Sequence, residues 1–433
     1  IADNAISEVA ADGIHVASVF GDDAFGVSPI YIEGNVISYA GDDGIEVADS
    51  GRTTIEGNTV SFAGSDGIVV HGVSAFDFYY PEAEEEEPVE EEFSVKTVAP
   101  VDGEWAYSVN IIGNVVDTTG DDGIEVFDSG RTLIAYNNVS NAGVLGSLSS
   151  SSEESKELNV NSDDDGYGSD AIHVRNVLGG EPVYEQGKVS LFLELPGSPE
   201  GPTAVDVLGN FVNVDSQTGD FIGDTADDGV QVLYSGDTLI DGNRIANSGF
   251  GDGAVDEWGP DGIHVLGGEL LPEPSESEDM FAYSTFFYVS GDSSVIVSNN
   301  YVDWTAGTGI EVEDSGRVEI SDNAVYESDD DGIRVSNSHA YDDDGSYSVE
   351  VLRNIVDVSG DDGIEVTRSG RTHIDGNTVS RSGDDGIVVS GVYASDFIYP
   401  LYPEVYFASE DLEPDPYAGY WDYSVTITNN DVS

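Results

Sequence analysis

The chain has 433 residues, and its 86 Asp and Glu against 13 Lys and Arg give a formal net charge of −73 at pH 7. Binding to nucleic acid or to an anionic lipid surface needs a basic face, so this charge argues against both partners. Cysteine is absent, which excludes disulfides, thiolate metal sites and a cysteine nucleophile. No apolar run reaches the roughly 18 residues of a bilayer span, so we expect no membrane insertion.

Two short motifs recur along the whole chain. The first, Asp-Gly-Ile-x-Val with variants, begins at Asp12, Asp43, Asp66, Asp122, Asp170, Asp228, Asp261, Thr308, Asp331, Asp362 and Asp385. The second, Ile-x-x-Asn-x-Val with variants, centres on Asn4, Asn35, Asn58, Asn114, Asn137, Asn210, Asn243, Asn300, Asn323, Asn354, Asn377 and Asn430. Repetition of this kind predicts a solenoid.

The repeat length favours β-strands. The shortest step between equivalent positions is 23 residues, as from Gly44 to Gly67, and that length holds about three short strands with tight turns. Apolar residues alternate with polar ones, as at Ile45 and Val47, which is the periodicity of strands. Longer steps contain the same unit with an insertion.

A longer period lies above the short one. Residues 1–75 align without a gap with residues 320–394 at a constant offset of 319, and the Gly-Asp-Asp-Gly-Ile-Glu-Val sequence beginning at Gly41 is repeated identically at Gly360. We therefore divide the chain into an eight-rung super-repeat, residues 1–319, and the start of a second copy, residues 320–433. A rung is one turn of the solenoid. We expect a single continuous solenoid that is a segment of a longer array.

These two motifs resemble the repeats of the right-handed parallel β-helices of the pectate-lyase-like superfamily. The resemblance covers essentially the whole chain and implies an all-β fold, a parallel β-helix of about 12 rungs with loop insertions on one edge. In that superfamily the Asn position forms an internal ladder at a turn. Some members cleave or epimerise acidic polysaccharides, and others are adhesins, tail spikes or structural surface proteins.

The Asp before each Gly-Ile predicts a second ladder, of carboxylates. Unit charges stacked at the spacing of neighbouring strands, about 4.8 Å, repel one another and need compensation by turn N–H groups, by Arg or by a hard divalent cation. Capping by N–H groups and Ca²⁺ binding both stay open from the sequence. The candidate Ca²⁺ ligands are the ladder residues together with the second Asp that precedes several of them: Asp42, Asp43, Asp66, Asp121, Asp122, Asp227, Asp228, Asp361, Asp362, Asp384 and Asp385.

The residue between Ile and Val of the first motif is expected to point outward, as a row along one sheet. Complementary groups are adjacent in this row, as in His15 with Glu46, Glu125 with His173, His264 with Glu311 and Arg334 with Glu365. Cross-strand pairing accounts for them. The other interpretation is an acid–base pair of the kind that polysaccharide-active enzymes use. Because the row simply continues the repeat, we predict no catalytic residues.

The insertions, residues 74–108, 143–204, 266–294 and 391–424, carry acidic runs and many aromatic residues. The aromatic side chains can roof the solenoid, contact other copies of the protein or stack on sugar rings.

These features predict a non-enzymatic structural protein of the extracellular space or cell surface: a filament, surface layer or adhesin stalk stabilised or cross-linked by Ca²⁺. Its expected partners are copies of itself, through end-to-end or lateral contacts, and surface polysaccharide. A polysaccharide lyase or epimerase and a carbohydrate-binding adhesin module are the alternatives. The strong acidity is also typical of proteins adapted to molar salt, so it does not by itself indicate calcium.

Overall fold

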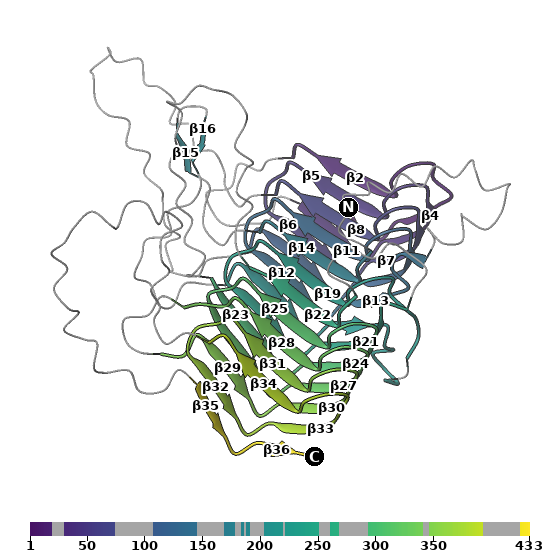
Figure 1. The fold of residues 1–433 in the computed structure, drawn as a ribbon. Helices are drawn as coiled ribbons and strands as arrows, with labels where there is room; N and C mark the ends of the chain where they lie inside the picture. The colour runs from purple at the N-terminus through teal and green to yellow at the C-terminus, as the bar shows by residue number, and fades with distance from the viewer. Residues whose placement is uncertain are drawn as a thin grey trace, which may run out of the picture.

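The computed structural model describes residues 1–19, 30–73, 107–144, 169–177, 203–219, 221–250, 260–267, 293–340, 346–392 and 425–433, and the backbone of two further strands, 183–185 and 188–190. The chain winds into a solenoid whose strands form three long parallel sheets, stacked from the N-terminal to the C-terminal end (Figure 1). Each rung contributes one strand to each sheet in turn.

The first sheet has twelve strands and begins just after the Asn of each rung; we call it the Asn-side sheet. Its strands are β1 (Ala5–Ser7), β4 (Val36–Ala40), β7 (Thr59–Ala63), β10 (Val115–Thr119), β13 (Asn138–Ser140), β18 (Phe211–Val212), β21 (Arg244–Ser248), β24 (Tyr301–Thr305), β27 (Ala324–Ser328), β30 (Ile355–Ser359), β33 (Thr378–Ser382) and β36 (Asp431–Val432).

The second sheet has eleven strands and follows the Asp-Gly turn; we call it the Asp-side sheet. Its strands are β2 (Ile14–Ala17), β5 (Ile45–Ala48), β8 (Ile68–His71), β11 (Ile124–Phe127), β14 (Ile172–Arg175), β19 (Val230–Leu233), β22 (Ile263–Leu266), β25 (Ile310–Glu313), β28 (Ile333–Ser336), β31 (Ile364–Thr367) and β34 (Ile387–Ser390).

The third sheet has eleven strands and completes each rung. Its strands are β3 (Ile30–Glu33), β6 (Thr53–Glu56), β9 (Val109–Ile112), β12 (Thr132–Ala135), β17 (Val205–Leu208), β20 (Thr238–Asp241), β23 (Ser294–Ser298), β26 (Arg317–Ser321), β29 (Val349–Leu352), β32 (Thr372–Asp375) and β35 (Val425–Thr428). A separate antiparallel pair, β15 (Val183–Glu185) and β16 (Lys188–Ser190), lies in one of the insertions.

The core fills the interior of the solenoid with aliphatic side chains that stack on their equivalents. Ile45 lies opposite Ile68, and Ile68 opposite Ile124, with all three fully buried. Burial of a side chain of this size contributes about 1.5 to 3 kcal/mol, and the same contact is repeated on every rung. The predicted all-β, right-handed parallel β-helix of about 12 rungs is therefore confirmed.

Each rung turns at corners where one residue adopts a left-handed backbone conformation. At the end of the Asn-side strands, this residue is the last but one of the strand: Tyr39 (φ 56°) in β4, Asn247 (φ 54°) in β21 and Trp304 (φ 59°) in β24. The glycine of the Asp-Gly turn is required by close packing. A Cβ atom on Gly123 would lie 2.2 Å from Val139 Cγ1 and 2.6 Å from the Ala171 carbonyl oxygen. The repeated glycine therefore allows neighbouring rungs to pack closely.

The insertions attach mainly at one corner, as predicted. The connections between β8 and β9, β14 and β17, β22 and β23, and β34 and β35 all leave the Asp-side sheet for the third sheet. The connection between β13 and β14 differs, because it leaves the Asn-side sheet. Tyr107 is described, and the Arg131 guanidinium lies over its ring at 4.0 Å; the other aromatic side chains of these insertions lie outside the described residues. The proposed boundary between residues 319 and 320 falls inside β26, and the division into super-repeats stays a prediction.

Candidate functional site

The Asn corner is a continuous hydrogen-bonded ladder. Asn137 is representative: its Nδ2 donates to Ile111 O at 2.9 Å and to Asn210 Oδ1 at 3.0 Å. Its own Oδ1 accepts from the backbone N and from Nδ2 of Asn114 at 2.9 and 3.0 Å. Equivalent side-chain bonds join the series from Asn4 to Asn430. The expected structural role of these residues is confirmed.

At the Asp corner, a carboxylate oxygen likewise accepts a hydrogen bond from the backbone of a neighbouring rung. Asp43 Oδ1 accepts from the backbone N of Asp66 at 3.1 Å, and Asp170 Oδ1 accepts from the backbone N of Asp228 at 2.8 Å. Such bonds link successive rungs from Asp43 to Thr308 and again from Asp331 to Asp385. Capping by N–H groups of the next rung, one of the two predicted ways to compensate the charge, is therefore present.

These hydrogen bonds do not compensate for the hydration that the carboxylates lose on burial. Burial, together with the charge of neighbouring carboxylates, raises the pKa of Asp43 and of Asp331 to about 7. The same causes raise the pKa of Asp66, Asp170 and Asp261 well above the usual range. The Asp corner is therefore electrostatically strained at neutral pH.

Several predicted calcium ligands gather at this corner. In the described part of the chain, three groups of carboxylates have ligand atoms within 4.8 Å of one another. They are Asp12 with Asp42 and Asp43, Asp330 with Asp331 and Asp361, and Asp361 with Asp362 and Asp384. Asp42 and Asp43 correspond to Asp361 and Asp362 at the offset of 319, so carboxylates cluster at equivalent turns in the two aligned segments.

The other predicted calcium ligands are placed differently. Asp122 lies in a fourth group, with Glu125 and His173, which mixes carboxylates with an imidazole. Among the described residues, no carboxylate group of this kind includes Asp66, Asp121, Asp227, Asp228 or Asp385. Asp121, for instance, accepts a hydrogen bond from Ser169 Oγ at 2.9 Å. Calcium binding itself stays a prediction.

The outward row of the Asp-side sheet changes character along the solenoid. His15, on the first rung, is about half exposed, with a side-chain exposure of 47%. The residues at the same position on six consecutive rungs in the middle of the sheet are all buried: Val69, Glu125, His173, Gln231, His264 and Glu311. The repeat in the sequence is therefore continuous, but the environment of this row is not.

The predicted cross-strand pairs are confirmed only in part. His15 Nδ1 contacts Glu46 and also lies 3.2 Å from Asp12 Oδ2, and Arg334 lies 3.7 Å from Glu365. Glu125 and His173 are register neighbours, as are His264 and Glu311. Both buried His side chains, however, face the Asp corner.

His173 Nδ1 lies 3.1 Å from Asp122 Oδ2, and His264 Nδ1 lies 3.4 Å from Asp228 Oδ2. The Asp at the turn is three positions before the outward residue, so it reaches the neighbouring rung's imidazole as easily as the residue opposite does. The available signal was the Asp that begins the preceding copy of the motif, three positions before the residue opposite each His.

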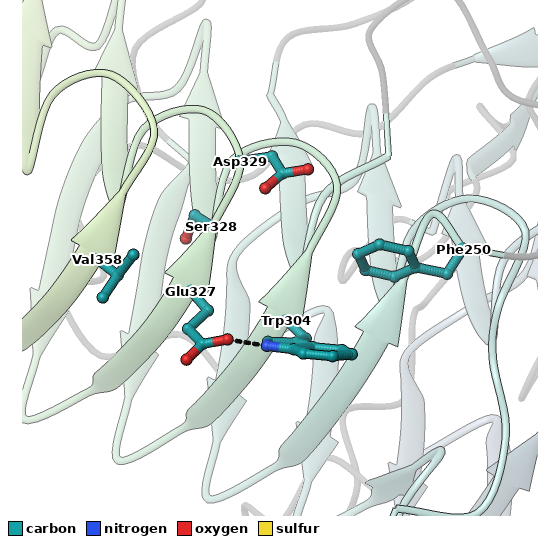
Figure 2. A pocket seen from close by; sticks show the side chains of 6 residues that line it. All are labelled: Phe250, Trp304, Glu327, Ser328, Asp329 and Val358. Atoms are coloured by element: carbon teal, nitrogen blue, oxygen red, sulfur yellow. Dashed lines mark hydrogen bonds between the residues drawn. The ribbon is translucent and has the colours of Figure 1, made fainter. Parts of the chain in front are cut away.

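A surface pocket of about 280 Å³ opens at the left-handed corner beyond the Asn-side sheet. Figure 2 shows Phe250 and Trp304 at one side and Glu327, Asp329 and Val358 at the other. Trp304 is 50% exposed and Phe250 45% exposed, and the Trp304 indole N–H donates to Glu327. The sequence analysis missed this pocket; the available signal was that Trp304 occupies the position of Asn247, a residue type that tolerates a left-handed turn.

Comparison with known proteins assigns the family. The profile of the right-handed beta helix region matches residues 12–172 and 228–398. The chain belongs to this family. No curated protein matches it.

Three solved structures align with this chain at low identity. The Dettilon tailspike protein aligns with 11% identity and a TM-score of 0.36, over 83% of this chain and 53% of the tailspike chain, so this chain spans about half of its length. The A-module of a mannuronan C-5 epimerase from Azotobacter vinelandii aligns with 10% identity and a TM-score of 0.22, over 90% of this chain and 86% of the module. The catalytic domain of an alpha-1,3-glucanase aligns with 10% identity and a TM-score of 0.25, over 90% and 62%. None of the described segments forms an apolar helix long enough to cross a bilayer.

Proposed function

We propose that this β-helix is a stiff, acidic structural element of an extracellular or cell-surface protein, and that Ca²⁺ binds at its Asp corner. The observation that carries the proposal is the Asn ladder, which continues from Asn4 to Asn430 with the same side-chain hydrogen bonds between rungs. A solenoid of this kind transmits load along its axis, because each rung is bonded only to its two neighbours.

Calcium gives this rod a way to associate. With a net charge of −73, copies of the protein repel one another, and divalent cations remove part of that repulsion. The groups around Asp42 and Asp361 provide the oxygen ligands that Ca²⁺ prefers, and waters complete its coordination. Lateral or end-to-end contact between copies then follows from cation binding.

The thermal midpoint of the protein in EDTA, in millimolar CaCl₂ and in molar NaCl tests this proposal. Calcium that binds the folded state must raise the midpoint by mass action, so we expect a larger rise with CaCl₂ than NaCl produces. The double substitution Asp361→Asn and Asp362→Asn should reduce that rise, and Asp375→Asn, at an exposed carboxylate outside the groups, should not. Equal midpoints in CaCl₂ and NaCl would show that screening alone stabilises the corner, as in proteins adapted to salt. Light scattering in the same buffers measures association.

A carbohydrate-binding adhesin module is the second candidate, and the Trp304 pocket favours it. The exposed indole is fixed by its bond to Glu327 and stands beside the tilted Phe250 ring at 6.1 Å. Aromatic faces next to carboxylates suit a sugar ring, whose C–H face packs on the indole while its hydroxyl groups donate to the carboxylates.

Affinity electrophoresis through gels that contain neutral polysaccharides tests this candidate. We expect Trp304→Ala to abolish retardation. Phe62→Ala is the matched control, since Phe62 is exposed at the same corner, where it stacks on Tyr39 with ring centroids 4.8 Å apart. Equal retardation of both variants and the unmodified protein would contradict a sugar site at Trp304. Cleavage of the polysaccharide during the experiment would instead identify an enzyme.

A further inference from the structure

Two adjacent rungs in the buried part of the Asp-side sheet bring four ligand-type side chains into one square. Asp122 and Glu125 belong to the turn and strand of one rung, and Asp170 and His173 hold the same positions on the next. The strands β11 and β14 pair so that Glu125 lies opposite His173. Asp122 Oδ1 accepts from the backbone N of Asp170 at 2.7 Å, which places the two turns directly against each other. The square is therefore fixed by backbone register.

The distances within the square match a coordination shell. Asp122, Glu125 and His173 each present one ligand atom, and the three atoms lie within 4.8 Å of one another. His173 Nδ1 is 3.1 Å from Asp122 Oδ2 and 3.9 Å from Asp170 Oδ2. Ligand atoms around a tetrahedral Zn²⁺ are about 3.3 Å apart, since each lies about 2 Å from the metal. Small side-chain movements would bring these atoms to that separation.

Asp170 supplies an independent indication that something is bound here. Its carboxylate is fully buried, and its Oδ2 atom makes no hydrogen bond, although Oδ1 caps the next rung. A buried carboxylate oxygen without a hydrogen bond is costly. His173 Nδ1 lies 3.9 Å from this oxygen, so the oxygen is directed toward the imidazole that also contacts Asp122. The nearby Arg175 guanidinium contacts Glu125 Oε1 at 3.4 Å.

We propose that Asp122, Glu125, Asp170 and His173 bind a divalent transition-metal ion of the zinc class. The imidazole selects against Ca²⁺, which takes oxygen ligands, and in favour of Zn²⁺ and its neighbours. Because His173 is only 1% exposed and the carboxylates beside it are also buried, the site is closed, as in structural rather than catalytic metal centres. The metal joins two rungs that the long connection between β13 and β14 separates in sequence. Its role is thus to fasten the middle of the solenoid.

The first rungs provide a matched control. Asp12 and His15 of one rung lie over Asp43 and Glu46 of the next, with the His and the Glu exchanged between the two rungs, and Asp12, His15 and Glu46 also form a compact group. This square is open to solvent, because the His15 side chain is about half exposed. The two groups therefore contain the same residue types, Asp, Glu and His, but differ in how far they are buried. His15→Gln serves as the control for His173→Gln.

Metal content after exhaustive dialysis tests the proposal. Protein loaded with Zn²⁺ is dialysed against buffer with millimolar CaCl₂ and molar NaCl, which removes ions held by surface carboxylates, and zinc is measured by mass spectrometry. We expect about one equivalent in the unmodified protein and in His15→Gln, and background in His173→Gln and Glu125→Gln. Retention in His173→Gln, loss in His15→Gln, or background zinc in the unmodified protein would each overturn the assignment.

A spectroscopic measurement covers the case in which the buried variants do not fold. Co²⁺ substituted into the unmodified protein should show ligand-field absorption of a four-coordinate site, with nitrogen ligation visible by pulsed electron paramagnetic resonance. A spectrum of hexa-aquo Co²⁺, or one without imidazole nitrogen, would contradict the site. Neither measurement depends on calcium at the exposed carboxylates, so failure here and failure of the proposed function are distinguishable.

Discussion

The Asn corner and the Asp corner of this solenoid use one hydrogen-bonding scheme with two different side chains. In both, a side-chain oxygen accepts a backbone N–H of an adjacent rung: Asn210 Oδ1 accepts from Asn137 on the preceding rung, and Asp66 Oδ1 accepts from Asp122 on the following rung, each at 2.9 Å. The difference lies in the second atom of the side chain. The amide has a donor there, which bonds both to a carbonyl group and to the next Asn, whereas the carboxylate has another acceptor and a charge.

This difference explains the electrostatics of the two corners. Asn137 is fully buried and its amide is satisfied by the ladder itself. At the Asp corner, the capped oxygen does not compensate the second one, and the pKa values rise from burial and mutual repulsion. A ladder of neutral amides therefore leaves no polar group unsatisfied, whatever its length. A ladder of carboxylates needs protons or cations to offset its charge. The Asp corner is thus the part of the solenoid that responds to its surroundings.

Exchanging the side chain of the Asn corner should have the largest effect. In Asn137→Asp the donor to Ile111 O and Asn210 Oδ1 becomes an acceptor, so two hydrogen bonds turn into contacts between oxygen atoms. We expect a loss of about 4 kcal/mol in the free energy of unfolding, because the buried groups left unsatisfied include a charge. Denaturant unfolding at neutral pH measures it. Asn4→Asp, at an exposed position of the same ladder, should cost far less; equal losses would show that burial does not decide the effect.

The pH dependence of the free energy of unfolding should be the next largest effect. The carboxylates of the Asp corner determine its sign. Asp43 and Asp331 have a folded-state pKa of about 7, above the unfolded value near 4. Their protonation therefore stabilises the fold at low pH, and this contribution disappears as the pH rises through 7. We expect the free energy of unfolding to increase by about 3 kcal/mol between about pH 8 and pH 5.

Below pH 4 the free energy of unfolding should instead decrease with falling pH, because of a different set of carboxylates. Hydrogen bonds from Arg353 lower the pKa of Asp322, and those from Arg381 and then Ser380 lower the pKa of Asp357. Their stabilising contribution is lost as they become protonated. Stability should consequently be greatest between about pH 4 and pH 6. A thermal midpoint that falls steadily from pH 8 to pH 5 would contradict the strain inferred at the Asp corner.

Placing an amide at the Asp corner should stabilise the protein. In Asp331→Asn, Oδ1 can still accept the backbone N–H of Asp362, now at 2.9 Å, and the charge that faces Asp330 and Asp361 is removed. We expect a gain of about 2 kcal/mol near pH 8 in EDTA, and a smaller gain near pH 5, where the carboxyl group of the unmodified protein is already neutral.

Asp375→Asn is the matched control for that gain. Its carboxylate is exposed and accepts hydrogen bonds from Thr428 Oγ1 and Asn429 Nδ2, which lower its pKa. The same chemical change there should not stabilise the protein. A gain at both positions would indicate a general effect of net charge rather than strain at the corner.

Much of this architecture could be predicted from the sequence, because a solenoid repeats its local rules. The alternation at Ile45 and Val47 fixed which face is buried, and the recurrence of Asn at one point of the repeat fixed the ladder. The partners of His173 could not be predicted in the same way. Register places Glu125 opposite it, yet the imidazole also lies 3.1 Å from Asp122 Oδ2, since the turn residue reaches across to the next rung.

The sequence also could not predict that the side chains in the middle of the outward row are buried. His15 and His173 have the same flanking motif, and only the three-dimensional packing around each rung makes one half exposed and the other buried. The Trp304 pocket depends on the direction in which a left-handed corner points its side chain, which one-dimensional patterning does not contain.

The smallest expected effect concerns Arg334, whose guanidinium contacts carboxylates on both neighbouring strands. Arg334 lies 3.2 Å from Glu311 and 3.7 Å from Glu365, on the strands either side of it. Arg334→Gln should lower the free energy of unfolding by about 1 kcal/mol, because the pairs are only partly buried, and molar NaCl should reduce the loss. Arg353→Gln, which removes an exposed pair with Asp322 on the opposite corner, is the control and should cost less. If both losses are equal, Arg334 acts as an ordinary surface cation, and the strain at the Asp corner is compensated by protons and bound cations alone.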